Sequence, residues 1–303
     1  MVTETRRVLA IMRMTVHNGP GLRTLVQFKG CPLRCQWCST PESQRDSLEI
    51  AVYPAKCIHC GECIPHCSSQ AIYLTAETVV VDRTRCDGCC NCIQACHAQA
   101  LVALGPLLTV EDIVAEVKRD VVFYKKSRGG VTLSGGEPLF DYRFTRQLLE
   151  ALHREGISVG MDTSGYVPWE RIEPLLPFIE FFLWDVKHMQ SEEHMKLTGV
   201  ANDLILRNAR AVAARNVPIY LRVPLIPGSN DSEENIVAIC KFARELPSLV
   251  EVDLLPLHHL GKARYQALDR RYLISNKQLY TDSALQKLKS LVESQGLVCQ
   301  IVS

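Results

Sequence analysis

The stretch Val131-Thr132-Leu133-Ser134-Gly135-Gly136-Glu137-Pro138 joins a strand-like apolar run directly to two glycines and a carboxylate. Similar apolar runs recur along the chain, and amphipathic helical stretches separate most of them. The strand-like runs are residues 24–28, 131–134, 157–162, 181–186, 219–224 and 250–256, and the helical stretches are 110–125, 141–155, 203–215 and 233–246. This alternation predicts an α/β fold with a parallel sheet covered by helices.

Polar residues stand at the ends of five of these runs. Glu137 follows one strand, Asp162 ends the next, and Asp185 and Lys187 end a third. Arg222 and His258 close the last two. Reactive groups gather at the carboxyl ends of parallel strands, so five such ends together predict one site.

The composition favours a protein that acts in the cytoplasm. Its 34 Lys plus Arg balance 33 Asp plus Glu, which gives no indication of nucleic-acid or membrane binding. We find no signal pattern, and no apolar run approaches the roughly 20 residues that span a bilayer. The 14 cysteines fall mostly into tight clusters typical of metal ligands, which predicts reduced thiols and an anaerobic setting.

Cys31, Cys35 and Cys38 offer three thiolates with no fourth protein ligand nearby. A structural zinc site is closed by four protein donors, whereas a 4Fe-4S cluster held by three cysteines leaves one iron open. We therefore expect chemistry at this iron.

Eight further cysteines form two copies of a C-x2-C-x2-C-x3-C run, which is typical of a two-cluster ferredoxin. In that pattern the fourth cysteine of each run binds the cluster of the other run. The predicted ligands are Cys57, Cys60, Cys63 and Cys96 for one 4Fe-4S cluster, and Cys86, Cys89, Cys92 and Cys67 for the second. Cys90 could compete as a ligand but breaks the repeat, and Cys240 and Cys299 are predicted to pack in the core. Two zinc ribbons, the alternative, fit this spacing poorly.

Several of these motifs resemble the radical S-adenosylmethionine enzymes, and within them the activating enzymes of glycyl radical enzymes. The triad spacing matches the hallmark of that superfamily, and Asn18-Gly19-Pro20-Gly21-Leu22-Arg23-Thr24 is similar to the activase signature. Asn18 stands where the family more often has Asp, and Ser39-Thr40 stand where His-Asn is frequent. The resemblance implies a partial, open parallel β/α barrel of about six units, formed by residues 1–51 and 105–303. A ferredoxin-like domain with two 4Fe-4S clusters, residues 52–104, interrupts it.

The resemblance also implies the site residues. Cys31, Cys35 and Cys38 would hold the catalytic cluster, with Trp37 shielding it from water. The residues expected to bind S-adenosylmethionine are Gly135, Gly136, Glu137, Asp185, Lys187, Arg222 and His258, with Glu137 accepting from the cofactor's amine. Asp162 and Thr163 match the position where related activases hold a monovalent cation.

The function implied is that of an oxidoreductase that cleaves S-adenosylmethionine reductively to a 5'-deoxyadenosyl radical. The radical then removes hydrogen from a backbone glycine of a partner glycyl radical enzyme. We expect a monomer that receives electrons from a flavodoxin or ferredoxin. Two alternatives remain open, another radical S-adenosylmethionine enzyme with auxiliary clusters and a plain electron carrier. The sequence does not identify the partner, the cluster potentials or the bound cation.

Overall fold

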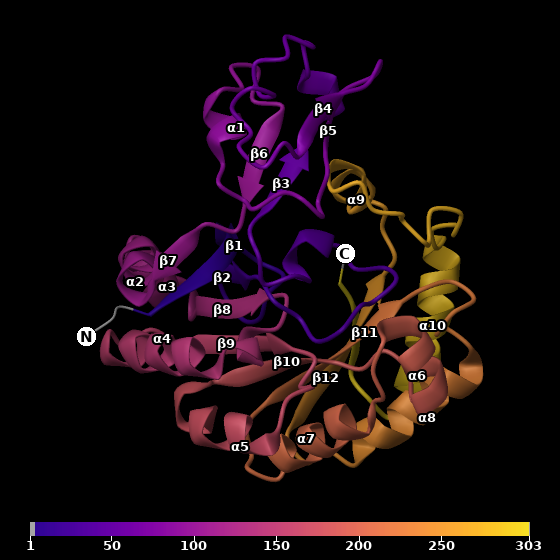
Figure 1. Cartoon of the computed structure of the whole chain (residues 1–303). Coiled ribbons are helices and arrows are strands. Elements are labelled where there is room, and N and C mark those ends of the chain that lie inside the picture. Colours follow the sequence, from indigo (N-terminus) through magenta and orange to yellow (C-terminus); the bar gives the residue numbers. More distant parts are fainter. Residues whose placement is uncertain (1–3, 303) are drawn as a thin grey trace.

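A computed structural model describes residues 4–302, so residues 1–3 and Ser303 of the predicted barrel lie outside the described part. A nine-stranded sheet forms its centre, in the order β13-β12-β11-β10-β9-β8-β2-β1-β7 (Figure 1). From β2 to β13 the neighbouring strands are parallel, and β1 and β7 add antiparallel pairs at one edge. The bounds are β1 Thr5–Thr15, β2 Arg23–Phe28, β7 Leu107–Thr109, β8 Gly130–Gly135, β9 Val159–Thr163, β10 Phe181–Asp185, β11 Ile219–Leu225, β12 Leu249–Pro256 and β13 Cys299–Ile301.

The six predicted strands are confirmed as β2 and β8 to β12, in the predicted parallel arrangement. Helices cover the outer face of the curved sheet (Figure 1). They are α2 Val110–Lys118, α3 Val121–Ser127, α4 Tyr142–Arg154, α5 Trp169–Ile172, α6 Ser191–Thr198, α7 Asp203–Ala213, α8 Glu233–Arg244 and α10 Asp282–Ser294, with α9 Lys262–Ala267 at the rim.

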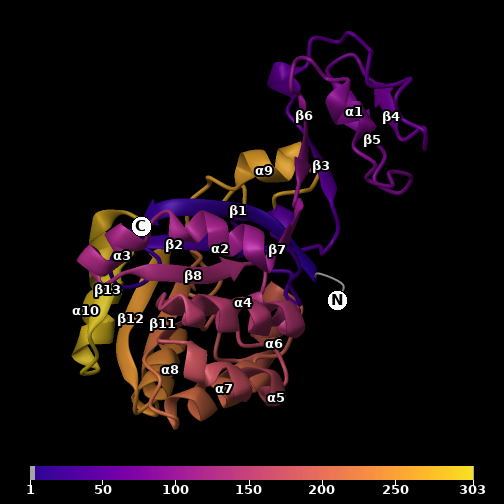
Figure 2. The same cartoon turned by 90° about the vertical axis from the view of Figure 1, so that its left-hand side faces the viewer.

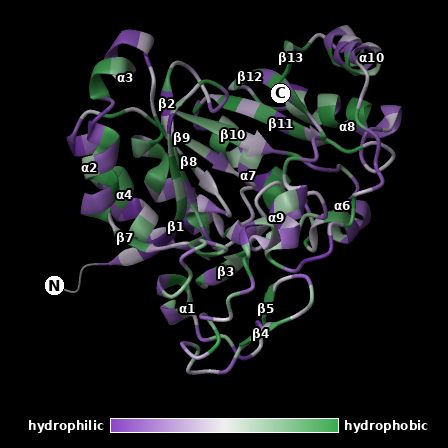
Figure 3. Ribbon diagram, turned by 90° about the horizontal axis from the view of Figure 1, so that it is seen from above, coloured by the Kyte–Doolittle hydropathy of each residue, from purple (hydrophilic) through white to green (hydrophobic). Residues whose placement is uncertain are grey.

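The main hydrophobic core lies between the sheet and these helices. Helix α4 shows how the sequence builds it, because Phe144, Leu148 and Leu152 recur at helical spacing and are fully buried. The Asp141 side chain accepts from the Phe144 N–H at 3.2 Å and caps the start of α4. Figure 3 shows the hydrophobic residues concentrated on the strands, with hydrophilic residues on the outer helices.

One predicted helix, residues 110–125, is wrong in its continuity. The structure has α2 and α3 instead, separated at Asp120. The Asp120 carboxylate is buried and accepts from the Arg13 guanidinium, with Arg13 Nε at 2.8 Å. It also accepts from the Thr24 hydroxyl at 3.0 Å. These partners lie on β1 and β2, so the break depends on tertiary contacts that helical periodicity does not report.

The segment Glu49–Leu104 forms a separate lobe, called the insert lobe below, which projects from the rim of the sheet (Figure 2). Strands β3 Glu49–Val52 and β6 Leu101–Leu104 pair antiparallel and connect it to the rest. The lobe also contains the antiparallel pair β4 Ile72–Leu74 and β5 Val79–Val81, and the short helix α1 Asn91–Gln94. Its apolar side chains form their own core, which shares no residue with the main core.

No helix within residues 4–302 combines the length and the apolar character that crossing a bilayer requires.

Candidate active site

A cavity of about 450 Å³ opens where the carboxyl ends of the parallel strands meet the loop that carries the cysteine triad. Most of the predicted site residues line this cavity although they are far apart in sequence. They are Cys31, Trp37, Cys35, Cys38, Gly135, Gly136, Asp162, Thr163, Asp185, Lys187, Arg222 and His258. The rule that reactive groups gather at strand ends therefore holds for this sheet.

The triad loop, residues 30–40, is held by backbone hydrogen bonds from two sides. The N–H groups of Arg34 and Gln36 donate to carbonyls at the end of α6, at 2.6 and 3.1 Å. On the other side, the Gly30 N–H donates to the Ser43 carbonyl at 2.8 Å. The loop is therefore shaped by the protein itself.

The three triad thiols are half-buried beside the cavity. Burial raises the pKa of the Cys35 thiol to about 12, and the nearby Lys187 charge opposes this rise. Burial likewise raises the pKa of Cys31 and Cys38. No three His, Cys, Asp or Glu side chains between residues 4 and 302 group closely enough to hold a single metal ion. A 4Fe-4S cube binds each cysteine through a different iron, so its ligands stand farther apart than those of one ion.

Gly135 and Gly136 allow β8 to end against the triad loop. Gly135 has φ +107°, and a Cβ there would lie 2.3 Å from the Phe28 nitrogen. A Cβ on Gly136 would lie 2.3 Å from the Gly30 carbonyl oxygen. The glycines are thus required by close approach of protein backbone, a reason additional to the approach of a ligand.

The Glu137 side chain, expected to accept from a cofactor amine, lies away from the cavity. Its side chain is fully buried and is absent from the cavity lining. One carboxylate oxygen accepts from the Thr163 hydroxyl at 2.6 Å, and the other accepts from the Ser164 hydroxyl at 2.7 Å and its N–H at 3.0 Å. Burial raises the pKa of Glu137, while the bonds from Ser164 and Thr163 oppose this shift. The carboxylate therefore ties the end of β8 to that of β9.

Four charged side chains face the cavity as two ion pairs. Lys187 Nζ lies 2.5 Å from Asp185 Oδ2, and Arg222 Nη1 lies 3.9 Å from Asp162 Oδ2. Burial lowers the pKa of Lys187, but the charges of Asp185 and Cys35 outweigh it, so the pKa lies above its usual value. Burial raises the pKa of Asp162, and Arg222 opposes this. The cavity therefore presents both signs of charge, as a zwitterionic ligand requires.

Other cavity residues were not singled out by the sequence analysis. They are the polar residues His17, Gln27, Ser43, Gln44 and Ser164 and several apolar ones, together with Asn18, Ser39, Thr40 and Ser134, which were quoted there only as parts of motifs. Ser134 donates to Asp162 Oδ2 at 2.7 Å, and Arg222 donates to the His17 carbonyl at 2.6 Å. The sequence could have indicated Ser134 as a site residue, because it directly precedes the glycine pair at the end of a predicted strand.

In the insert lobe, the first three cysteines of run 57–67 share a small cavity with the last cysteine of run 86–96. Its cysteines are Cys57, Cys60, Cys63 and Cys96, and its other walls are mostly apolar. Burial raises the pKa of Cys92, and among the charges that add to this are those of Cys86, Cys67 and Cys89. The small cavity thus brings together four thiols drawn from both runs, and the thiol of Cys92 lies within electrostatic reach of those of Cys86, Cys67 and Cys89, and also of Cys63.

The two runs also repeat each other in backbone conformation. Residues two and four positions after the first cysteine have positive φ in both: His59 and Gly61 in one run, Gly88 and Cys90 in the other. Cys67 Sγ accepts from the Ala71 N–H at 3.2 Å, just as Cys96 Sγ accepts from the Ala100 N–H at 3.3 Å. Cys90 therefore occupies the position of Gly61, which has no side chain, and burial and the charges of the nearby Cys89 and Cys86 raise its pKa.

Comparison with known proteins agrees with this geometry. The family model described as the Radical SAM superfamily matches residues 83–240, more than half of the chain. The isethionate sulfite-lyase activating enzyme of Nitratidesulfovibrio vulgaris is 39% identical over 86% of this chain and 86% of its own length. The choline trimethylamine-lyase activating enzyme of Oleidesulfovibrio alaskensis is 34% identical over 100% of this chain and 99% of its own length. A radical SAM methyltransferase from Sphaerobacter thermophilus, at 16% identity, shares the fold with a TM-score of 0.55 over 92% of this chain and 66% of its own.

The open α/β sheet, the cysteine triad beside the strand-end cavity and the match to activating enzymes along nearly the whole chain agree with one another. Such an enzyme uses a 4Fe-4S cluster and S-adenosylmethionine, and its partner is a glycyl radical enzyme. The chain belongs to the radical S-adenosylmethionine superfamily and, within it, to the activating enzymes of glycyl radical enzymes.

Proposed function

We propose that the cavity binds S-adenosylmethionine beside a 4Fe-4S cluster held by Cys31, Cys35 and Cys38. The observation that carries this proposal is the shared cavity, which is lined by all three triad cysteines, the glycine pair and both ion pairs. When bound, the cluster and S-adenosylmethionine would supply the 5'-deoxyadenosyl radical that removes hydrogen from the partner's glycine.

The side chains around the cavity would orient S-adenosylmethionine. Lys187 and Asp185 offer opposite charges to its carboxylate and its cationic groups, and Arg222 adds a second cation. The backbone at Gly135 and Gly136 would take the place of the Glu137 side chain in contacting the amino group. Trp37, which packs against Ile226 and Leu257, and His258 would limit access of water.

A monovalent cation beside Asp162 and Thr163 is a further part of this proposal. Both residues line the cavity, and carboxylate oxygen suits a hard cation. The Thr163 hydroxyl already donates to Glu137 and accepts from the Gly165 N–H at 2.9 Å, so Asp162 would be the main side-chain ligand.

We also propose that residues 52–104 form a ferredoxin-like domain with two further 4Fe-4S clusters, set into a barrel formed by residues 1–51 and 105–303. The shared cavity of Cys57, Cys60, Cys63 and Cys96 supports the ligand assignment for the first of these clusters, and the repeated N–H···S bonds suit cluster ligands in both runs. This domain would relay electrons from a flavodoxin or ferredoxin to the triad cluster. The chain would work as a monomer in the cytoplasm, where thiols stay reduced.

The test is activation of a partner in an anaerobic assay. The reconstituted protein, with reductant and S-adenosylmethionine, should release 5'-deoxyadenosine and generate a glycyl radical signal in electron paramagnetic resonance (EPR) spectra. Isethionate sulfite-lyase and choline trimethylamine-lyase are the first partners to try, because activases of both align along most of this chain.

A Lys187→Met variant should raise the KM for S-adenosylmethionine. Glu150→Gln, which removes an exposed ion pair on α4, is the matched control and should leave KM unchanged. An unaltered KM in Lys187→Met would contradict the proposed cofactor site.

A further inference from the structure

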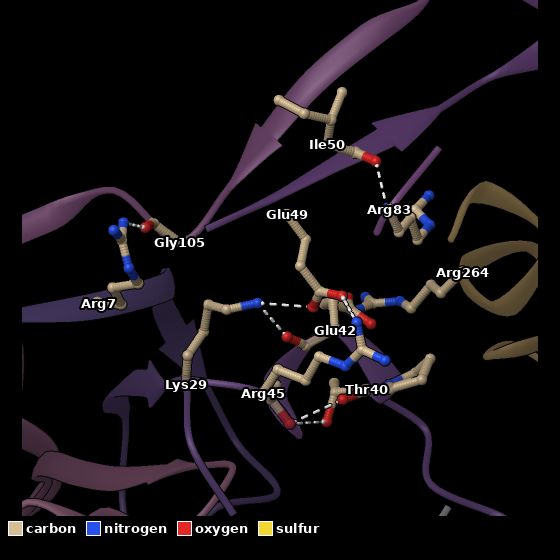
Figure 4. A network of polar contacts seen from close by, with 12 residues as sticks. Arg7, Lys29, Thr40, Glu42, Arg45, Glu49, Ile50, Arg83, Gly105 and Arg264 are labelled. Carbon is tan, nitrogen blue, oxygen red and sulfur yellow. Dashed lines mark hydrogen bonds and ion pairs between the residues drawn. The ribbon is translucent and has the colours of Figure 1, made fainter. Parts of the chain in front are cut away.

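A polar network with a buried centre at Lys29, Glu42 and Glu49 joins the insert lobe to the triad loop and to α9 (Figure 4). We call it the insert junction and define it by Lys29, Glu42, Glu49, Arg83, Arg264 and Arg270. We propose that the insert junction is a positioning site that fixes the insert lobe relative to the triad cluster. This inference rests on the proposed function of the lobe as an electron relay.

Lys29 holds both strands that connect the lobe. Its side chain is fully buried, and its Nζ lies 3.1 Å from the Glu49 carboxylate at the start of β3. A Cβ on Gly105, directly after β6, would lie only 2.1 Å from Lys29 Cδ, so the lysine stem packs against the point where the chain leaves the lobe. The Arg7 guanidinium adds a bond to the Gly105 carbonyl at 2.9 Å.

The insert junction also includes residues on both sides of the segment that carries the triad. Lys29 stands two residues before Cys31, and its ammonium also donates to the Glu42 carbonyl, four residues after Cys38. The Glu42 carboxylate is buried and lies 2.5 Å from Arg264 on α9. A displacement of the lobe would therefore reach the segment that carries the triad.

Helix α9 completes the connection. Arg270, just after α9, lies 2.5 Å from Glu49 and also donates to the Pro41 carbonyl beside Glu42. From the lobe, Arg83 donates to the Ile50 carbonyl at 3.0 Å and to the Ala267 carbonyl at the end of α9 at 3.3 Å. Arg83 stands three residues before Cys86, so this contact attaches the side of the lobe that contains residues 86–96 to the end of α9.

The polar network matters because the hydrophobic cores do not join here. The core of the lobe and the main core share no residue, and only β3 and β6 connect the lobe covalently. Two independently packed bodies joined by a two-stranded ribbon can move relative to each other unless their interface fixes them. Lys29 and Glu49 form an ion pair that is buried on both sides, and Arg264 and Arg270 add partly exposed guanidinium groups at short distance from the buried carboxylates of Glu42 and Glu49.

The experiment compares Glu49→Gln and Arg270→Met with wild type and with the exposed-pair control Glu150→Gln. Hydrogen exchange reports the attachment of the lobe whether or not it holds clusters. In both junction variants, exchange in β3, β6 and α9 should be about tenfold faster or more, while exchange in β9 and β10 is unchanged. Arg270→Lys should restore protection in part, since it keeps the charge.

EPR spectra of the fully reduced protein report the geometry of the clusters. The spin coupling between the lobe and the triad cluster should weaken in both junction variants, with iron and sulfide contents equal to those of wild type. Unchanged coupling and unchanged exchange would overturn the proposal. Loss of the lobe's iron in both variants would also overturn it, because the junction would then serve folding instead of position.

Wild-type protein that holds iron only in the triad would refute the relay function. In that case hydrogen exchange would still test the junction.

Discussion

The region built on the nine-stranded sheet, called the barrel below after the proposed fold, and the insert lobe reach a folded state by different means. The barrel buries a continuous core in which Phe144, Trp184 and Leu221 are fully enclosed between the sheet and the helices. The lobe has short strands and a small core in which cysteines stand among the apolar residues. Burial of apolar surface can by itself stabilise the barrel. The insert lobe buries much less apolar surface, so it needs a further source of stability. Cluster binding would supply it, because metal binding to a site that forms only on folding is itself folding free energy.

The largest expected effect comes from the triad. Cys35→Ala should reduce 5'-deoxyadenosine formation to background, since an open-iron cluster cannot be held by two thiolates. Iron content should fall by one cluster, while hydrogen exchange in both the barrel and the lobe stays as in wild type. The measurement is product quantification after anaerobic incubation, and product formation at the wild-type rate would contradict the assignment.

Two buried cysteines give the sharpest contrast between the regions. Cys92 lies in the lobe and Cys240 lies on α8 in the barrel, and both are buried. Cys92→Ala should remove a cluster and speed amide hydrogen exchange in most of the lobe. Exchange in the barrel should stay as in wild type. Cys240→Ala should leave all clusters in place and cost only about 1 kcal/mol of barrel stability, as expected for a small buried side chain. Equal iron contents in the two variants would refute the contrast.

A large-to-small substitution in the barrel core should destabilise the barrel and leave the lobe unaffected. Leu148→Ala removes a fully buried side chain from α4 and should lower the free energy of unfolding of the barrel by about 2–5 kcal/mol. Chemical denaturation followed by circular dichroism measures this loss. The EPR spectrum of the lobe should stay unchanged at low denaturant, because the two cores are separate.

The smallest effect is a pH dependence confined to the barrel. Burial raises the pKa of Asp253 to about 6, and Arg222, with Nε 3.6 Å from Asp253 Oδ2, opposes this. A carboxyl whose folded pKa exceeds its unfolded value binds protons preferentially in the folded state, so its contribution to stability is lost as pH rises toward that pKa. Asp253→Asn should therefore remove about 1 kcal/mol of the decline in stability between pH 5 and pH 7. Denaturation of the cluster-free protein at both pH values measures the difference.

The parts of the fold that could be predicted are those encoded by local pattern. The apolar runs in the sequence predicted six parallel strands, which the structure contains. The rule that polar residues meet at strand ends predicted that Asp162, Asp185 and Arg222 lie together, and all three line one cavity. Strand β1 was missed because its sequence carries three arginines, which period-two patterning does not favour. One of them, Arg6, is buried only because it donates to the Pro138 and Glu137 carbonyls, far along the chain.

The role of Glu137 could not be read from the sequence for a related reason. A carboxylate after a glycine pair at a strand end has the same local pattern whether it faces a ligand or a neighbouring strand. Its true partners, Thr163 and Ser164, come from the end of β9. The insert junction is equally nonlocal, since Glu49 meets Arg270 across more than two hundred residues.

The Glu137 contacts have a consequence for affinity. Its carboxylate is bonded to the end of β9, and its carbonyl accepts from Arg6 on β1 at 2.8 Å. Three strands are thereby locked together at the rim of the cavity by protein groups alone. A rim that is already ordered loses little conformational entropy when a ligand arrives, and low ordering entropy strengthens binding without any added contact. In this enzyme, the buried glutamate would contribute to cofactor affinity by limiting motion before the cofactor binds.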